Sequence, residues 1–289
     1  AWYAHRARAM SAREMAYRAG LRLRSERRRR EAATWPSLRS VLDPSFLGQE
    51  DPEPANLALE AFRCQRRIWD CDGNTDPTAW LLAERPDIAQ ATVQVAMRLR
   101  SGQLALFGHL TDIGVSPDWH RDPVHGGTWP LRYWSSVDYR SGGAKYVWEI
   151  NRHQHLPTLA RAYRYTGDEE FAALACAHLV GWIDRNPHLI GINWTSGIEL
   201  ALRLIAWAWM VELSARALSL SPEVFHDVLV AVHAQATFIA ENRSRYSSAN
   251  NHAIAEAAGL VAAGVVFPML RDAPTWRHLG ALVLSDELP

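Results

Sequence analysis

The chain has 289 residues, of which 31 are Lys or Arg and 31 are Asp or Glu. This length suffices for one large or two ordinary domains with a sizeable core. The balanced charge argues against binding to nucleic acid or to a membrane surface through the overall electric field, and we expect neither partner. No apolar stretch is long enough for a membrane span, and three cysteines are too few for a disulfide framework. Thirteen tryptophans are the unusual feature, because indole rings fill cores and also stack on sugars.

The N-terminal part of the chain is basic. Arginines are frequent between residues 6 and 39 and include the run Arg27–Arg30. Residues 10–33 are predicted to form a helix, because Ser11 and Glu14 have the spacing of a capping box. Such a run can contact anionic partners, although a solvated helix face is the more common arrangement.

Helices and irregular segments alternate further along the basic part. Residues 35–54 contain four prolines and predict a linker. Residues 56–69 are consistent with a short amphipathic helix, and residues 87–100 predict another helix. We therefore expect residues 1–110 to form a basic helical extension with a linker.

We expect residues 111–289 to form the main domain, and the character of the sequence changes at Pro117. Residues 103–113 predict a short extended piece next to this boundary. Residues 117–143 then combine aromatic, charged, proline and glycine residues without any period. Long loops of this kind in compact domains are commonly functional, and the aromatic residues, Trp129 among them, argue against disorder.

Two histidines in this loop raise the question of a metal site. His120 and His125 lie close in sequence to Asp118 and Asp122. Their spacing matches no established ligand pattern, so we predict no metal and no other cofactor.

After Gly143 the pattern predicts consecutive helices. The expected ranges are 145–166, 168–185, 196–219, 222–242 and 247–267. Asp168 is the expected N-cap of the second helix, and Pro222 is the expected first residue of the fourth. Short connections make successive helices antiparallel hairpins, which indicates an all-α bundle, solenoid or α/α toroid. Nothing in the sequence indicates a sheet.

Three polar clusters recur where loops meet helices. Their members are Glu149, Asn151 and Arg152; Asn193, Trp194, Glu199 and Arg203; and Asn250, Asn251 and His252. Alternate helix starts lie at the same end of an antiparallel array, so these groups can line a cleft. The alternative is that Glu149–Arg152 and Glu199–Arg203 are intrahelical pairs, each stabilising its helix by about 0.2–0.5 kcal/mol.

The last of these clusters opens an apolar helix. The segment from Tyr246 to Pro268 starts with small polar residues, of which Ser247 or Ser248 can serve as N-cap. His252 and Glu256 lie four residues apart and share one helix face. Taken alone, the segment is more typical of a capped helix with a hydrogen-bonded core histidine than of a catalytic site.

Three motifs in the same order give the sequence a resemblance to a known family. KYVWEINRHQH, NPHLIGINWTSGIEL and YSSANNHAIAEAAGL together resemble the heparinase II/III family of polysaccharide lyases, which includes oligoalginate lyases. The resemblance implies an incomplete α/α toroid of antiparallel helical hairpins, followed in the family by a C-terminal β-sandwich that this chain lacks. It also implies an acidic, uronate-containing polysaccharide as partner and a periplasmic or secreted location.

The resemblance also implies a reaction and roles for individual residues. A carbon–oxygen lyase of this family cleaves by β-elimination, which requires that the uronate carboxylate be neutralised before the C5 proton is removed. Asn251 matches the family's neutralising asparagine, and His252 acts beside it or as the base for one C5 epimer. Fixed donors of this kind contribute about 3–4 kcal/mol each in other enzymes. The expected substrate-binding residues are Asn250, Glu149, Asn151, Arg152, Asn193, Trp194, Glu199, Arg203, Trp129 and Tyr246.

The resemblance is incomplete at the C-terminal end. In the family a catalytic tyrosine follows the Asn-His motif by several dozen residues, and this chain ends at Pro289. We therefore expect the chain to hold half of an active site and to show little lyase activity alone. Two alternatives remain: an α/α-toroid glycoside hydrolase that uses Glu149 and Glu199, and a non-catalytic carbohydrate-binding or scaffold domain.

Overall fold

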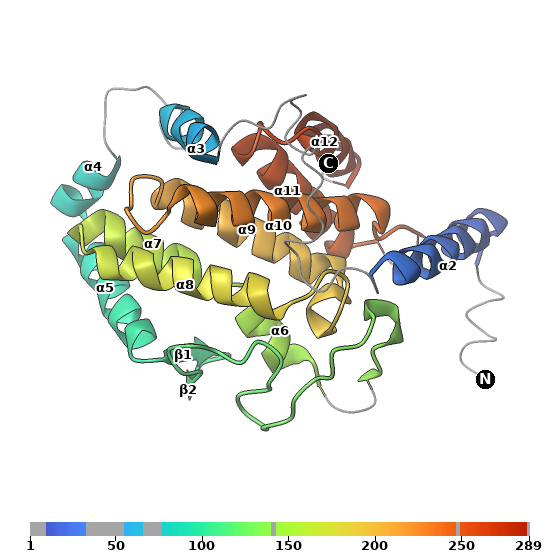
Figure 1. The fold of residues 1–289 in the computed structure, drawn as a ribbon, viewed down its shortest axis with the longest axis horizontal. Coiled ribbons are helices and arrows are strands. Elements are labelled where there is room, and N and C mark those ends of the chain that lie inside the picture. The colour runs from blue at the N-terminus through green and yellow to red at the C-terminus, as the bar shows by residue number, and fades with distance from the viewer. Residues whose placement is uncertain (1–9, 33–54, 66–76, 140–142, 247–248, 288–289) are drawn as a thin grey trace.

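The computed structural model describes residues 10–32, 55–65, 77–139, 143–246 and 249–287. This part of the chain is mainly helical and includes one β-hairpin (Figure 1). None of its helices combines the length and the apolar character that crossing a bilayer requires.

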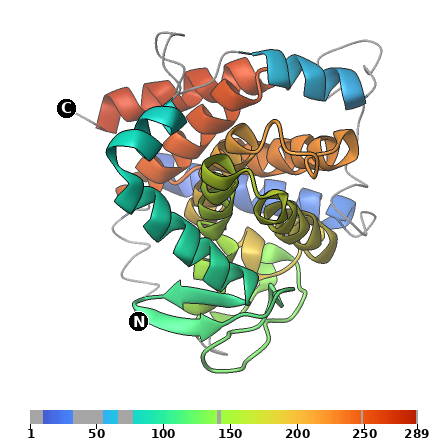
Figure 2. The same cartoon turned by 90° about the vertical axis from the view of Figure 1, so that its left-hand side faces the viewer.

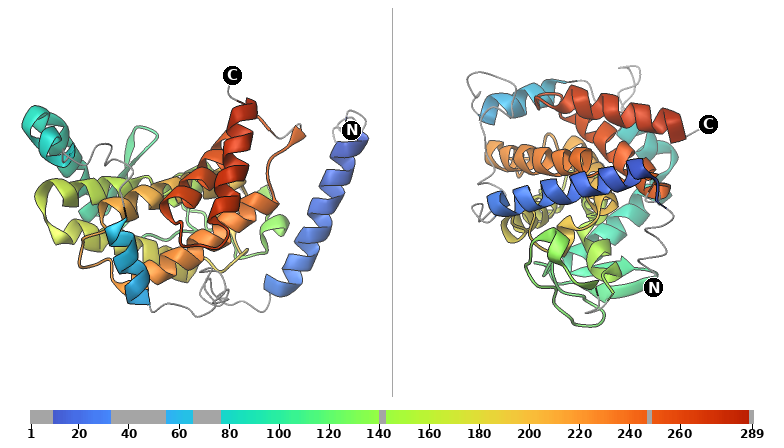
Figure 3. Two further views of the ribbon diagram at one scale, coloured as in Figure 1. Left: turned by 90° about the horizontal axis from the view of Figure 1, so that it is seen from above. Right: turned by 90° about the vertical axis from the view of Figure 1, so that its right-hand side faces the viewer.

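The basic N-terminal segment forms the long helix α2 (Ala12–Ala32), which projects from one end of the molecule (Figures 1 and 3). The Ser11 hydroxyl accepts a hydrogen bond from the backbone N of Glu14 at 3.1 Å, so the predicted cap is confirmed. The predicted linker at residues 35–54 lies outside the described residues.

Three helices follow in the described parts of the N-terminal region. α3 (Ala55–Cys64) and α5 (Pro86–Arg100) correspond to the predicted helices, although residues 66–69 of the first prediction lie outside the described residues. α4 (Pro77–Glu84) was not expected from the sequence. It has only eight residues, too few for a helical period to stand out in the sequence, and none of them is buried.

The predicted extended piece is a β-hairpin. β1 (Gln103–Leu106) pairs with β2 (His109–Asp112) in antiparallel register, and Gln103 lies opposite Asp112. The two turn residues, Phe107 and Gly108, have φ values of 48° and 85°, as a two-residue hairpin requires. The expectation that the chain has no sheet is therefore wrong at this hairpin.

Residues 113–139, between the hairpin and α6 (Lys145–Asn151), are mostly irregular and contain a short 3-10 helix, η3 (Trp134–Ser136). The expected helix from 145 to 166 is in fact two helices, because α7 (His155–Thr166) starts separately. His153 has a φ of 59° at the break. Pro157 indicates the break in the sequence, since proline is tolerated in the first turn of a helix but not inside one.

The remaining helices form the body of the molecule. They are α8 (Glu169–Arg185), α9 (Gly197–Leu213), α10 (Pro222–Glu241), α11 (Asn251–Val266) and α12 (Ala273–Glu287), with the 3-10 helix η5 (Ile192–Trp194) before α9. Asp168 caps α8 through a 3.0 Å bond from the backbone N of Glu170, as predicted. α9 ends six residues earlier than expected, because the chain turns so that Ser219 donates to Glu169 of α8 at 2.8 Å.

The sequence interpretation missed α12 altogether. This helix packs along α11, and α11 in turn packs along α9 (Figure 1). The contact between α11 and α9 depends on Gly259, where an added Cβ would lie 2.7 Å from the Cα of Ala201. The antiparallel hairpins make the incomplete α/α toroid predicted from the sequence (Figure 2 shows α7 and α8 nearly end-on).

Most of the described tryptophans belong to the core rather than to a surface. Trp119, Trp182, Trp194 and Trp207 are all at most 1% exposed. Trp182 and Trp207 meet edge to face with their ring centroids 5.5 Å apart. The high tryptophan content therefore mainly reflects helix packing.

Candidate functional site

A cavity of about 480 Å³ opens where the start of α11 meets the start of α9. Its polar wall contains Asn250, Asn251 and His252 from the α11 side and Thr195 and Gly197 from the α9 side. The rings of Trp134 and Phe238 and the side chain of Leu21 add an apolar surface. The cavity thus combines amide and imidazole groups with aromatic rings.

The Asn-Asn-His motif sits at the N-terminus of α11. All three of its side chains are exposed, and α11 starts at Asn251. The N-cap is Asn250, whose side chain makes no capping bond, whereas the predicted caps Ser247 and Ser248 lie outside the described residues. The first-turn amides of a helix carry partial positive charge, so an anion at this cavity meets both the helix terminus and the Asn251 and His252 side chains.

Glu256 closes the cavity on the inner side. Its carboxylate is buried and accepts hydrogen bonds from the backbone N and the hydroxyl of Ser244, at 2.7 and 2.8 Å. Burial raises the pKa of Glu256, opposed by these two bonds and by the charge of His252. Glu256 therefore holds the connection between α10 and α11.

Helix α2 also contacts the connection between α10 and α11. The Tyr17 hydroxyl donates to the carbonyl oxygen of Arg243 at 2.6 Å, and its ring meets that of Tyr246 edge to face at 5.8 Å. The guanidinium of Arg245 lies 5.4 Å from the Tyr17 ring. Tyr246 itself lines a neighbouring hollow of about 160 Å³ together with Ser244. No local pattern marks Tyr17, because its partner is 226 residues away.

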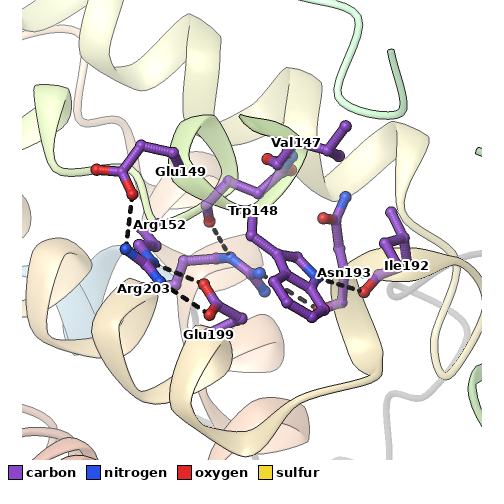
Figure 4. A network of polar contacts seen from close by, with 9 residues as sticks. Val147, Trp148, Glu149, Arg152, Ile192, Asn193, Glu199 and Arg203 are labelled. Atoms are coloured by element: carbon purple, nitrogen blue, oxygen red, sulfur yellow. Dashed lines mark hydrogen bonds and ion pairs between the residues drawn. The ribbon is translucent and has the colours of Figure 1, made fainter. Parts of the chain in front are cut away.

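The first two clusters meet in one ion-pair network (Figure 4), whose Glu199 follows Gly197 of the cavity wall by two residues. Arg152 donates to Glu149 at 2.6 Å and to both oxygens of Glu199 at 2.7 and 3.0 Å. The predicted Glu149–Arg152 pair is thus confirmed. The predicted pairing of Glu199 with Arg203 is wrong, because Glu199 bonds Arg152, which follows the last residue of α6.

The buried asparagines of these clusters hold the long loop. Asn151 donates to the carbonyl oxygens of Trp119 and Val147 at 2.9 and 2.7 Å and accepts from Trp182 at 2.8 Å. Asn193 donates to the same Trp119 oxygen at 3.2 Å. Both side chains are at most 1% exposed, so their amide hydrogens already have protein acceptors.

Arg203 is also an internal group. It is fully buried, and its guanidinium donates to the carbonyl oxygen of Asn151 at 2.6 Å and to Gln235 at 2.8 Å. The same guanidinium lies 4.2 Å from the Trp182 ring centroid, and burial lowers the pKa of Arg203 to about 9. Because Arg203 is fully buried and bonded to protein groups, it stabilises the interior and is not exposed to a ligand.

The expected substrate-binding residues therefore fall into two groups. Asn250 lines the cavity with the two expected catalytic residues, whereas Glu149, Arg152 and Tyr246 are partly exposed but are not among the residues that line it. The structure places the others in the interior, where they make no part of the cavity surface. They are Asn151, Asn193, Trp194, Arg203, Trp129 and, with a side chain 3% exposed, Glu199.

The ion-pair network of Glu149, Arg152 and Glu199 also bears on the alternative that the protein is a glycoside hydrolase. Glycoside hydrolysis needs two carboxyl groups on either side of a sugar, one as acid and one as base or nucleophile. Glu149 and Glu199 instead share one guanidinium, and Glu199 is buried. Their geometry suits a structural ion-pair network.

The histidines of the long loop have local partners. His120 lies 2.9 Å from the carbonyl oxygen of Arg185, and its backbone N bonds Asp118 at 3.1 Å. The His125 ring lies 3.0 Å from Asp122. Within the described residues no group of three or more His, Cys, Asp or Glu side chains is arranged to hold a metal ion.

The fold and the site define a helical toroid domain with a polar, aromatic-lined cavity at the helix starts. The family described as Heparinase II/III N-terminus matches residues 45–289, and the chain belongs to this family.

The curated relatives that the chain matches include heparin-sulfate lyases from several bacteria. That of Bacteroides stercoris is 27% identical over 276 residues, covering 88% of this chain and 37% of the relative. That of Pedobacter heparinus is 26% identical over 147 residues, covering 49% of this chain and 22% of the relative. The chain therefore spans little more than a third of the first of these relatives.

Solved structures show the same fold. The heparan sulfate lyase HepC from Pedobacter heparinus superposes with a TM-score of 0.59 at 20% identity, over 81% of this chain and 34% of that one. A heparinase III structure gives a TM-score of 0.60 at 22% identity, over 88% of this chain and 38% of the other.

Proposed function

We propose that this chain forms the toroid portion of a polysaccharide lyase that cleaves uronate-containing acidic polysaccharide by β-elimination. The observation that carries the proposal is the placement of Asn251 and His252, exposed side by side at the start of α11 in the wall of the cavity. The names of the relatives, heparin-sulfate lyases, support the same reaction and substrate class. Because an acidic polysaccharide of this kind lies outside the cell, we propose a periplasmic or secreted location for the enzyme.

The chemistry assigned to the site is neutralisation of the substrate carboxylate. The amide of Asn251, the imidazole of His252 and the first-turn amides of α11 all present N–H groups to one region. Hydrogen bonds to the carboxylate stabilise the negative charge that develops when the C5 proton leaves, and such preorganised donors act most strongly in transition states. The C4–O4 bond then breaks, the leaving oxygen takes a proton, and a C4–C5 double bond remains. His252 can also serve as the base for one C5 epimer.

The reaction type is tested with the full-length protein and two polymers, one heparan-like and one alginate-like. A lyase gives oligosaccharides whose new non-reducing ends contain an unsaturated uronate, which absorbs in the ultraviolet. Product mass separates the alternatives, because hydrolysis adds one water to the products and elimination does not. Saturated products would replace the proposal by a hydrolase, and binding without any product would replace it by a carbohydrate-binding protein.

A further inference from the structure

Helix α2 extends beyond the Asn251–His252 cavity and is strongly basic. It contains eight arginines and three glutamates, for a formal charge of 8 − 3 = +5. Leu21, Arg24, Ser25 and Arg28 are spaced by three and four residues and share one face. Leu21 contributes to the cavity at Asn251. The other three side chains line a second cavity of about 250 Å³.

The two cavities are neighbours. Trp134, Phe238 and Asn242 contribute to both, so these three side chains form a shared wall. A linear polymer held at the first cavity can therefore continue along α2 to the second.

Cationic side chains outnumber anionic ones around the second cavity and the adjoining hollow. The charged residues lining the two are Arg24, Arg27, Arg28, Arg271, Glu241 and Asp272. Their formal charge is 4 − 2 = +2, with histidines neutral. Burial lowers the pKa of His188 to about 3, so this ring adds no charge at neutral pH.

The arginines of α2 can exchange their present contacts for a ligand. Arg28 pairs with Glu241 at 2.5 Å, with the two side chains 33% and 36% exposed. Such exposed pairs are weak, at about 0–1 kcal/mol. The contact that the structure shows for Arg24 is the carbonyl oxygen of Glu241, at 3.3 Å. Arginine binds carboxylate and sulfate alike through two parallel N–H donors.

We propose that Arg24 and Arg28, together with the cavity beside them, form an anion-binding subsite for the carboxylate or sulfate of a sugar unit that flanks the unit held at Asn251 and His252. The identity of the ligand as an acidic oligosaccharide rests on the proposed function. The position of the subsite rests on the shared wall and on the shared face of α2.

The subsite is tested by titration calorimetry on the full-length protein, with Asn251→Ala present throughout to prevent turnover. The probes are two hexasaccharides with the same uronate backbone, one sulfated and one without sulfate. The double variant Arg24→Gln/Arg28→Gln is compared with Arg30→Gln, whose side chain is exposed on the opposite face of α2. Arg24→Gln alone leaves the Arg28–Glu241 pair intact and guards against a folding defect in the double variant.

We expect the double variant to bind about 10-fold more weakly and to lose part of the salt dependence of binding, because fewer ionic contacts form. Arg24→Gln should give a smaller loss in the same direction, and Arg30→Gln should bind as the reference does. An equal loss for both probes identifies carboxylate as the bound group, and a loss restricted to the sulfated probe identifies sulfate. Unchanged binding of both probes by a folded double variant or by Arg24→Gln would overturn the proposal.

Failure of the subsite and failure of the lyase proposal give different results. Unsaturated product from the wild-type protein, with unchanged affinity in the Arg24 and Arg28 variants, refutes only the subsite. Absence of unsaturated product, with affinity that still depends on Arg24 and Arg28, refutes only the lyase.

Discussion

The carboxylate of Glu256 accepts two hydrogen bonds from Ser244, one from its backbone N at 2.7 Å and one from its hydroxyl at 2.8 Å. These bonds join the second turn of α11 to Ser244, in the connection between α10 and α11. They therefore fix the backbone on both sides of the Asn-Asn-His motif. The carboxylate also lies directly against Gly197, at the start of α9.

Gly197→Ala should displace the Glu256 carboxylate, because the added methyl group would overlap it. We expect a loss of about 1–3 kcal/mol in the free energy of unfolding, typical of overpacking. The measurement is denaturant unfolding. Gly181→Ala in α8 is the matched control, because nothing lies within 4 Å of its added Cβ. This control should gain up to about 1 kcal/mol in helix propensity. Equal stability of the two variants would argue against the close contact.

Asn250 adopts a backbone conformation that favours glycine, with φ 65° and ψ −140°. Asn250→Gly should therefore keep or raise the thermal midpoint, whereas Asn250→Ala should lower stability by about 1 kcal/mol. Differential scanning calorimetry of both variants measures the difference. A more stable alanine variant would contradict the strained conformation.

Arg152 balances two carboxylates, one of which is buried. Arg152→Gln leaves the Glu199 side chain, 3% exposed, without its cation, and we expect a loss of about 3 kcal/mol in the free energy of unfolding. Arg85→Gln is the control, because the Arg85–Asp87 side chains are 52% and 65% exposed and their pairing should leave stability nearly unchanged. Denaturant unfolding at neutral pH compares the two. Similar losses would mean that the Arg152 network is no stronger than a surface pair.

Four buried histidines should make the fold sensitive to acid. Burial lowers the pKa of each below its ordinary value; the four are His153, His155, His178 and His188. Below about pH 6.5 the unfolded chain binds more protons at these groups than the folded chain does. The free energy of unfolding should therefore fall as the pH drops below about 6.5, by more than ~1.4 kcal/mol per pH unit. Urea unfolding between pH 7.5 and 5 measures this slope, and a flat profile would contradict the prediction.

Local signals predicted the helical architecture well. The caps at Ser11 and Asp168 are confirmed because each depends on residues within one turn. The break at His153 was missed, since the helical period continues on both sides of it and Pro157 was the only nearby sign. α12 was missed as well, although it packs against α11.

The site itself was predictable in part. The Asn-Asn-His motif could be singled out because three consecutive polar residues open an apolar helix, and the structure places them at the start of α11. The long-range contacts were not predicted. Tyr17 bonds a residue 226 positions away, and Arg152 bonds Glu199 across 47 residues. Asn151, Asn193 and Arg203 were expected at the substrate, but they bond to loop and helix groups in the interior. Sequence spacing cannot tell a buried polar group from a cleft residue.

The proposed neutralisation of the substrate carboxylate by Asn251 and His252 is tested through turnover in single variants. The full-length protein is compared with Asn251→Ala and His252→Ala through the rate of formation of unsaturated uronate at saturating polysaccharide, with binding and thermal stability measured in parallel. We predict that each variant loses about 10²-fold or more in kcat, while binding and the thermal midpoint stay close to those of the parent. Turnover within twofold of the parent in the Asn251→Ala protein would contradict the account.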